Sequence, residues 1–180
     1  HMARLLDDYL HGDRSFADAL FTPGEGQLGR TLVHETALPD GDHAEVVDYE
    51  RATRLIEAAG GGALSLCYCR HVGEHVGKPC THRVDNCTSL DPAAQYSVRH
   101  GFGRRAEVPE LLEVLAQARE AGLVQIVDNV KHRPSYLCHC CGCHCGQLRA
   151  ISEFGLKGAV QTSNRIAAID ADRCTGCGKC

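Results

Sequence analysis

The twelve cysteines of this 180-residue chain are the residues whose spacing most needs a chemical explanation. None lies in residues 1–66, and five crowd into residues 138–145. Disulfides are disfavoured, because the adjacent Cys140 and Cys141 and the Cys-x-Cys pairs around them close only small, strained loops. Dense thiolates are instead typical of metal centres. The cysteines form three groups: Cys67, Cys69, Cys80 and Cys87; Cys138, Cys140, Cys141, Cys143 and Cys145; and Cys174, Cys177 and Cys180.

The C-terminal group has three cysteines at successive spacings of three, Cys174, Cys177 and Cys180. This spacing favours a [4Fe–4S] cubane of the bacterial ferredoxin type, whereas a zinc knuckle normally uses two cysteines. Gly176 and Gly178 can adopt positive φ, which lets backbone N–H groups approach cluster sulfides. Because a ferredoxin motif continues to a fourth cysteine and a proline, we expect either a shortened chain or a fourth ligand from another group. Zinc is the alternative metal.

The first group predicts one four-thiolate site, with two cysteines after an expected strand and two in the loop that follows. His71 and His75 lie in the same segment. We expect them to donate hydrogen bonds to cluster sulfurs, with metal binding by a histidine as the less favoured alternative.

The central group, residues 138–145, contains too many thiolates in one turn to reach a single metal without strain. We therefore expect it to serve two centres. His139 and His144 are further candidates for hydrogen bonds to cluster sulfurs. With all twelve cysteines as iron ligands, the count predicts two [4Fe–4S] clusters, and a third if a central cysteine completes the C-terminal group.

Three motifs carry a family resemblance: Cys67-Tyr-Cys-Arg-His71, Tyr136-Leu-Cys-His-Cys-Cys-Gly-Cys-His-Cys145 and Cys174-Thr-Gly-Cys-Gly-Lys-Cys180. Together they make residues 46–180 similar to the multi-cluster 4Fe–4S ferredoxin-type proteins of anaerobic and sulfate-reducing bacteria. In that family a cysteine-rich domain precedes a ferredoxin motif. The resemblance implies cytoplasmic electron transfer, with another redox protein or a larger oxidoreductase as the partner. The chain departs from the pattern at His144, where a further cysteine is expected, and at the missing fourth cysteine and proline.

A weaker resemblance rests on Cys140-Cys141-Gly142 followed 32 residues later by Cys174-x-x-Cys177. This arrangement is similar to the CCG domains of heterodisulfide reductases, although the upstream cysteine that the motif requires is missing at the usual distance. It implies a redox enzyme that acts at a site-differentiated or non-cubane cluster.

The helices and strands that the sequence predicts around these cysteine groups indicate an α+β fold. Residues 1–45 predict an acidic helical N-terminal segment, and residues 46–180 a cysteine-rich domain that binds iron–sulfur clusters. The helix expected at 109–121, with the strand pair that follows it, has the pattern of a winged helix. Hydrophobic periodicity and turn residues predict helices over 3–21, 46–59, 91–100, 109–121 and 147–154, and strands over 28–38, 63–68, 123–130, 135–139 and 165–170.

Composition and charge narrow the classes of function. Hydrophobic residues make up 43% of the chain and charged residues 23%, which excludes global disorder. No run approaches the roughly 18 apolar residues of a membrane span, and we expect no secretory signal. The expected helix 109–121 carries Glu110, Glu113 and Glu120 against Arg119, which would repel nucleic-acid phosphates. Electron transfer is therefore the leading hypothesis, ahead of catalysis at an unusual cluster and of a redox-sensing winged-helix regulator.

Overall fold

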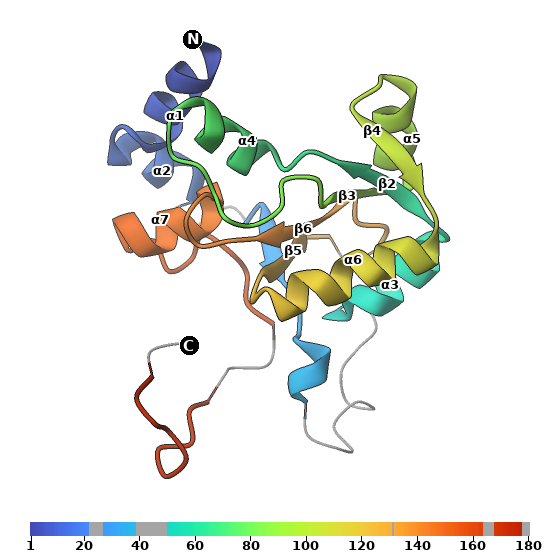
Figure 1. The fold of residues 1–180 in the computed structure, drawn as a ribbon. Helices are drawn as coiled ribbons and strands as arrows, with labels where there is room; N and C mark the ends of the chain where they lie inside the picture. Colours follow the sequence, from blue (N-terminus) through green and yellow to red (C-terminus); the bar gives the residue numbers. More distant parts are fainter. Residues whose placement is uncertain (22–26, 39–49, 131, 164–167, 178–180) are drawn as a thin grey trace.

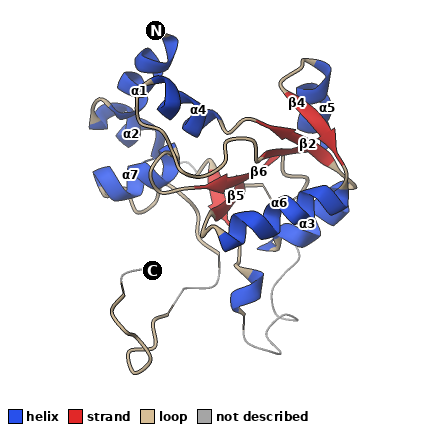
Figure 2. Ribbon diagram, in the orientation of Figure 1, coloured by secondary structure: helices blue, strands red, loops and turns tan. Residues whose placement is uncertain are grey.

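The protein is an α+β fold built on one six-stranded sheet, as the sequence predicts (Figures 1 and 2). The computed structural model describes residues 1–21, 27–38, 50–130, 132–163 and 168–177. The strand order is β1-β5-β6-β3-β2-β4, and every neighbouring pair is antiparallel. The strands are β1 (Gly29–Thr31), β2 (Gly62–Ser65), β3 (Cys87–Leu90), β4 (Gly103–Ala106), β5 (Val124–Asp128) and β6 (Tyr136–Cys140).

Helices surround this sheet on both sides. They are α1 (Met2–His11), α2 (Arg14–Phe21), α3 (Ala52–Ala59), α4 (Tyr68–His75), α5 (Asp91–Arg99), α6 (Val108–Glu120) and α7 (Gly146–Phe154). A short 3-10 helix covers Glu35–Ala37. No helix in the described residues combines the length and the apolar character that crossing a lipid bilayer requires.

The main hydrophobic core lies between one sheet face and the helices α3 and α6. Leu90 and Leu137 are fully buried there, against Ile56 of α3 and Leu111 and Leu115 of α6. Side chains alternate between the two faces of a strand, so the neighbours of Leu137 in β6 point away from this core. Those neighbours include Cys138, and the opposite sheet face is therefore available for a second kind of site.

The N-terminal residues contribute to that opposite side. Strand β1 pairs with β5, α1 packs against α4, and α2 packs against α7. Figure 1 shows α1, α2, α4 and α7 gathered at one end of the sheet, while α3 and α6 lie together across it. The helices near the cysteines thus come from both ends of the sequence.

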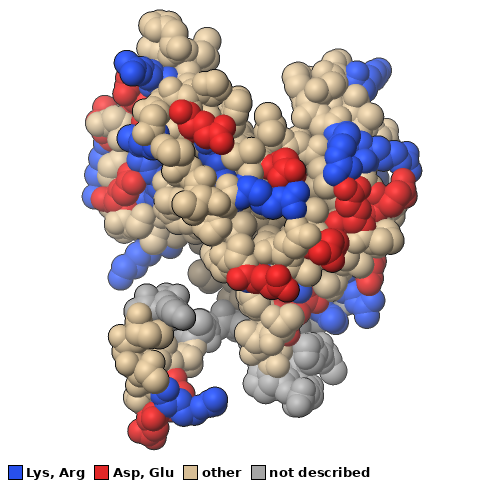
Figure 3. Space-filling view, in the orientation of Figure 1, with Lys and Arg blue, Asp and Glu red and all other residues tan. Residues whose placement is uncertain are grey.

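The central helix and strand pair are confirmed as α6, β5 and β6. The pair is not a separate wing, because β1 and β3 flank it within the larger sheet. Acidic and basic side chains are interspersed over the face drawn in Figure 3, and the exposed side of α6 includes Glu113 and Glu120.

Four predicted elements have wrong bounds. The strand expected over 28–38 covers only Gly29–Thr31, and Glu35–Ala37 form the 3-10 helix instead. The helix expected from residue 46 begins at Ala52, because Arg51 has an extended backbone with φ −107° and ψ 115°. Residues 46–49 lie outside the described part of the chain. The strand expected over 63–68 ends at Ser65, because Cys67 caps α4. Of the strand expected over 165–170, the described residues 168–170 are irregular.

Candidate metal centres

Seven cysteines line a single cavity of about 470 Å³ on the sheet face opposite the main core. One of them, Cys141, also lies in a second group of candidate ligands described below. We name the cavity after the other six and call it the six-thiol cavity. These six come from two of the three sequence groups, and they are Cys67, Cys69, Cys87, Cys138, Cys140 and Cys145. No disulfide joins any two of the described cysteines.

The sheet register brings three of these thiols together. Strand β3 pairs with β6 through Thr88 and Leu137. In an antiparallel pair this register places Cys87 opposite Cys138, on the face that Leu137 does not occupy. Cys140 follows two residues later in β6 and points to the same face.

Two helices supply the other thiols at their N-termini. Cys67 is the N-cap of α4, and Cys145 is the N-cap of α7. The backbone N–H groups of Arg70, near Cys67, and of Gln147 and Leu148, near Cys145, favour the thiolate form of these two sulfurs. Unpaired N–H groups and the helix dipole at an N-terminus both favour thiolate over thiol. Both caps are therefore suited to bind a cation.

Hydrogen bonds between the thiols divide the set into donors and acceptors. A hydrogen bond from Cys69 lowers the pKa of Cys67 to about 6. Hydrogen bonds from Cys140 and Cys87 lower the pKa of Cys138, and one from Cys140 lowers the pKa of Cys145. The same contacts raise the pKa of each donor thiol. Three of the six sulfurs are consequently disposed to ionise.

Arg70 lies beside the six-thiol cavity and is fully buried. Its guanidinium donates to the backbone oxygen of Arg83 at 2.7 Å, to Asn86 Oδ1 at 2.8 Å, to the His139 carbonyl, and to Cys141 Sγ at 3.4 Å. None of these partners, among the residues the structure describes, is a carboxylate. A buried cation needs a compensating negative charge, and sulfur is the group beside Arg70 that can carry it. The site therefore favours ionised, metal-binding sulfur.

A second group lies next to the first and could hold a metal ion. One ligand atom from each of Cys80, Cys141, Cys143 and His144 lies within 4.8 Å of the others. Cys80 was expected to join Cys67 and Cys69, and that expectation was wrong. Helix α4 separates Cys80 from those two cysteines, and the loop that follows α4 runs beside the turn between β6 and α7.

The central cysteines divide between the two groups at the end of β6. Cys138, Cys140 and Cys145 line the six-thiol cavity, Cys143 belongs with Cys80, and Cys141 lies in both groups. Because Cys140 is the last residue of the strand, the chain turns after it and the two groups diverge from this point.

The C-terminal cysteines belong to neither group in the described residues. Cys174 and Cys177 are exposed, and Cys180 lies outside the described part of the chain. Gly176 has the positive φ that the sequence predicts, 66°, and donates its N–H to Cys174 Sγ at 3.4 Å. The approach of this N–H group to a cluster sulfide stays a prediction. Completion of this group by a central cysteine remains a prediction.

The four candidate histidines occupy different surroundings. His71 and His75 are neighbours on α4, with their Nε2 atoms 3.3 Å apart, and His71 also lies 3.7 Å from Glu74. His139 is buried, and its burial lowers the pKa of the imidazole to about 4. Since it alternates with Cys138 along β6, it points away from the six-thiol cavity. His144 is the histidine that stands among candidate ligands.

Sequence reasoning did not single out Arg70, although it stands within the quoted motif. The only sequence signal is its position three residues after Cys67, which one helical turn would bring to the same side. Comparison with models of known protein families, with curated proteins and with solved structures finds no match to this chain. Its function must therefore be argued from the two cysteine groups.

Proposed function

We propose that the six-thiol cavity binds an iron–sulfur cluster and that the protein transfers electrons. The observation that carries this proposal is the convergence of these six thiols on one cavity beside a buried arginine that no carboxylate of the described residues contacts. A [4Fe–4S] cluster takes four thiolates, so the residues present are sufficient to hold it. The ferredoxin-type resemblance favours the same cofactor.

The chain's own groups would tune such a cluster. A cluster held by these thiolates would accept and release single electrons. Its reduction potential would depend on nearby charge, on hydrogen bonds to the sulfurs and on exposure to solvent. The buried Arg70 and the two helix N-termini offset negative charge, so they favour the reduced state. The C-terminal group would hold a further cluster, and the partner would be another redox protein or a larger oxidoreductase in the cytoplasm.

Iron and sulfide analysis with EPR tests the proposal. The full chain, purified without oxygen, is expected to be brown, to contain about four irons and four sulfides per occupied cluster, and to give a cluster EPR signal after reduction. Cys138→Ser should remove the cluster of the six-thiol cavity, whereas Cys174→Ser should remove only a C-terminal one. A colourless chain without sulfide would contradict the proposal.

Catalysis at the cluster is the second candidate, and one observation favours it. A cavity of about 420 Å³ between α1, α4 and α7 is lined by Cys69 of the six-thiol cavity and by His144 of the second group. Two of the six thiols also exceed what a cubane needs. If small disulfides or thioesters added to the reduced protein change the EPR signal and are consumed, catalysis replaces simple electron transfer.

A further inference from the structure

We propose that Cys80, Cys141, Cys143 and His144 bind a single zinc ion in a tetrahedral Cys3His site. This site lies next to the six-thiol cavity, which Cys141 also borders. The inference goes beyond the proposed electron transfer, because it assigns a different metal to different residues. It stands even if the six-thiol cavity proves to hold no cluster.

The spacing of the sulfur atoms points to one ion. Cys80 Sγ lies 3.9 Å from Cys141 Sγ and 3.7 Å from Cys143 Sγ. A zinc–sulfur bond of about 2.3 Å places the sulfurs of a tetrahedron about 3.8 Å apart. The thiolates of a cubane bind different irons and lie farther apart. The Cys80 sulfur is therefore at the separation from both other sulfurs that a single tetrahedral ion requires, and all four ligand atoms lie within 4.8 Å of one another.

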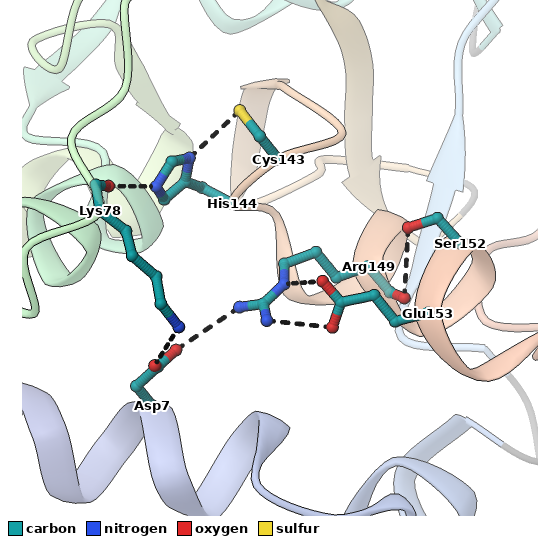
Figure 4. Close-up of polar contacts among 7 residues, drawn as sticks. All are labelled: Asp7, Lys78, Cys143, His144, Arg149, Ser152 and Glu153. Carbon is teal, nitrogen blue, oxygen red and sulfur yellow. Dashed lines mark hydrogen bonds and ion pairs between the residues drawn. The ribbon is translucent and has the colours of Figure 1, made fainter.

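The imidazole of His144 is oriented as a zinc ligand (Figure 4). Its Nε2 atom lies 2.7 Å from the backbone oxygen of Lys78, and only a protonated nitrogen can donate to a carbonyl. This contact leaves Nδ1 unprotonated, 3.2 Å from Cys143 Sγ. Histidine ligands of metals almost always donate their second ring nitrogen to a carbonyl or carboxylate in this way.

Charge and packing complete the site. Three thiolates and one Zn²⁺ leave one negative charge in excess, and Arg70 donates a hydrogen bond to one of those sulfurs, Cys141 Sγ. The apolar side chains of Ala118 and Leu123 pack against Cys141. Three sulfurs with one imidazole nitrogen are a donor set typical of structural zinc.

The position of the site in the fold indicates its role. Cys80 comes from the loop after α4, while the other three ligands come from the turn between β6 and α7. That turn separates Cys140 from Cys145, both of which line the six-thiol cavity. A zinc ion holding the turn to the loop would fix the distance between these two thiols. The zinc site would thus stabilise the relative position of two thiols of the six-thiol cavity.

Metal analysis of matched variants tests the assignment. The full chain is expected to bind about one zinc per molecule. Cys80→Ser and His144→Ala should lose that zinc while iron and sulfide stay at the wild-type level, whereas Cys138→Ser should lose iron and keep zinc. His100→Ala, which replaces an exposed histidine just after α5 and outside both cysteine groups, is the control and should keep both. Loss of iron and sulfide instead of zinc in Cys80→Ser would overturn the proposal.

Cobalt substitution of the unmutated chain tests the zinc assignment even if these variants fail to fold. Co²⁺ bound to three thiolates and one imidazole should give the intense visible bands of a tetrahedral complex together with sulfur-to-cobalt charge transfer. Cobalt without thiolate bands, or iron in this site at full zinc supply, would refute the assignment. A chain with zinc but without iron would refute the proposed electron transfer and leave the zinc site intact.

Discussion

The imidazole of His144 lies directly against Gly73, in the middle of α4. A methyl group at Gly73 would overlap Cδ2 and Nε2 of the ring and would also come within 2.9 Å of the Lys78 backbone oxygen. Glycine in a helix interior costs about 1 kcal/mol relative to alanine. Glycine at position 73 therefore lowers the stability of α4, but it allows the imidazole of His144 to approach the helix closely.

We expect Gly73→Ala to weaken zinc binding on the order of 10- to 100-fold, because the ring must move away from the Lys78 carbonyl. Competition with a chromogenic chelator measures the affinity. Gly142→Ala is the matched control, since a Cβ there meets no atom within 4 Å in the described structure. Equal zinc affinity in the two variants would show that the contact does not hold the ligand in place.

Arg70→Met should lower the free energy of unfolding by about 3 kcal/mol, because it leaves buried acceptors and ionised sulfur without their cation. It should also make the reduction potential of a cluster in the six-thiol cavity more negative. Urea denaturation and redox titration measure the two effects. Arg83→Met is the control: its exposed pair with Asp85, at 2.8 Å, should contribute less than about 1 kcal/mol. Similar losses in both variants would argue against a special role for Arg70.

The buried Glu35 should make the fold sensitive to acid. Burial alone would raise the pKa of Glu35, but hydrogen bonds from Thr53, Arg119 and Arg51 outweigh it and lower the pKa below 4.5. A carboxyl with a depressed pKa stabilises the fold above its unfolded pKa, and this stabilisation is lost as the pH falls through the folded value.

Glu35→Gln should therefore cost on the order of 2 kcal/mol at pH 7 and progressively less below about pH 4.5. Chemical denaturation of both proteins between pH 3 and pH 7 would reveal this convergence. A constant difference across that range would mean that the charge of Glu35 contributes nothing to stability.

Removal of zinc should loosen two segments and leave the main core unchanged. After treatment with a strong zinc chelator, we expect faster amide hydrogen exchange in residues 76–86 and 141–145, because the ion ties these segments together. Helices α3 and α6, which pack in the separate main core, provide the internal reference. Protection that is unchanged in both segments would show that the fold holds them without metal.

The sequence by itself determined the fold class and predicted metal chemistry. Both follow from local spacing: the helix 109–121 and its strand pair come from short-range periodicity, and packing alone does not require five thiols in eight residues. The beginning of α3 was misjudged because propensity does not reveal that Arg51 is extended and reaches Glu35 at 3.0 Å. A contact between residues far apart in the chain, such as this ion pair, produces no periodic pattern in the sequence.

Only the tertiary structure decided which cysteines meet. Cys87 faces Cys138 because β3 pairs with β6, and Cys80 joins Cys141 because α4 turns the chain away from Cys67. Arg70 and Cys141 are 71 residues apart in the chain, so no motif could connect them. Strand order and helix direction set the distances between residues that are far apart in the chain. The spacing of residues in the sequence determines only contacts within one or two helical turns.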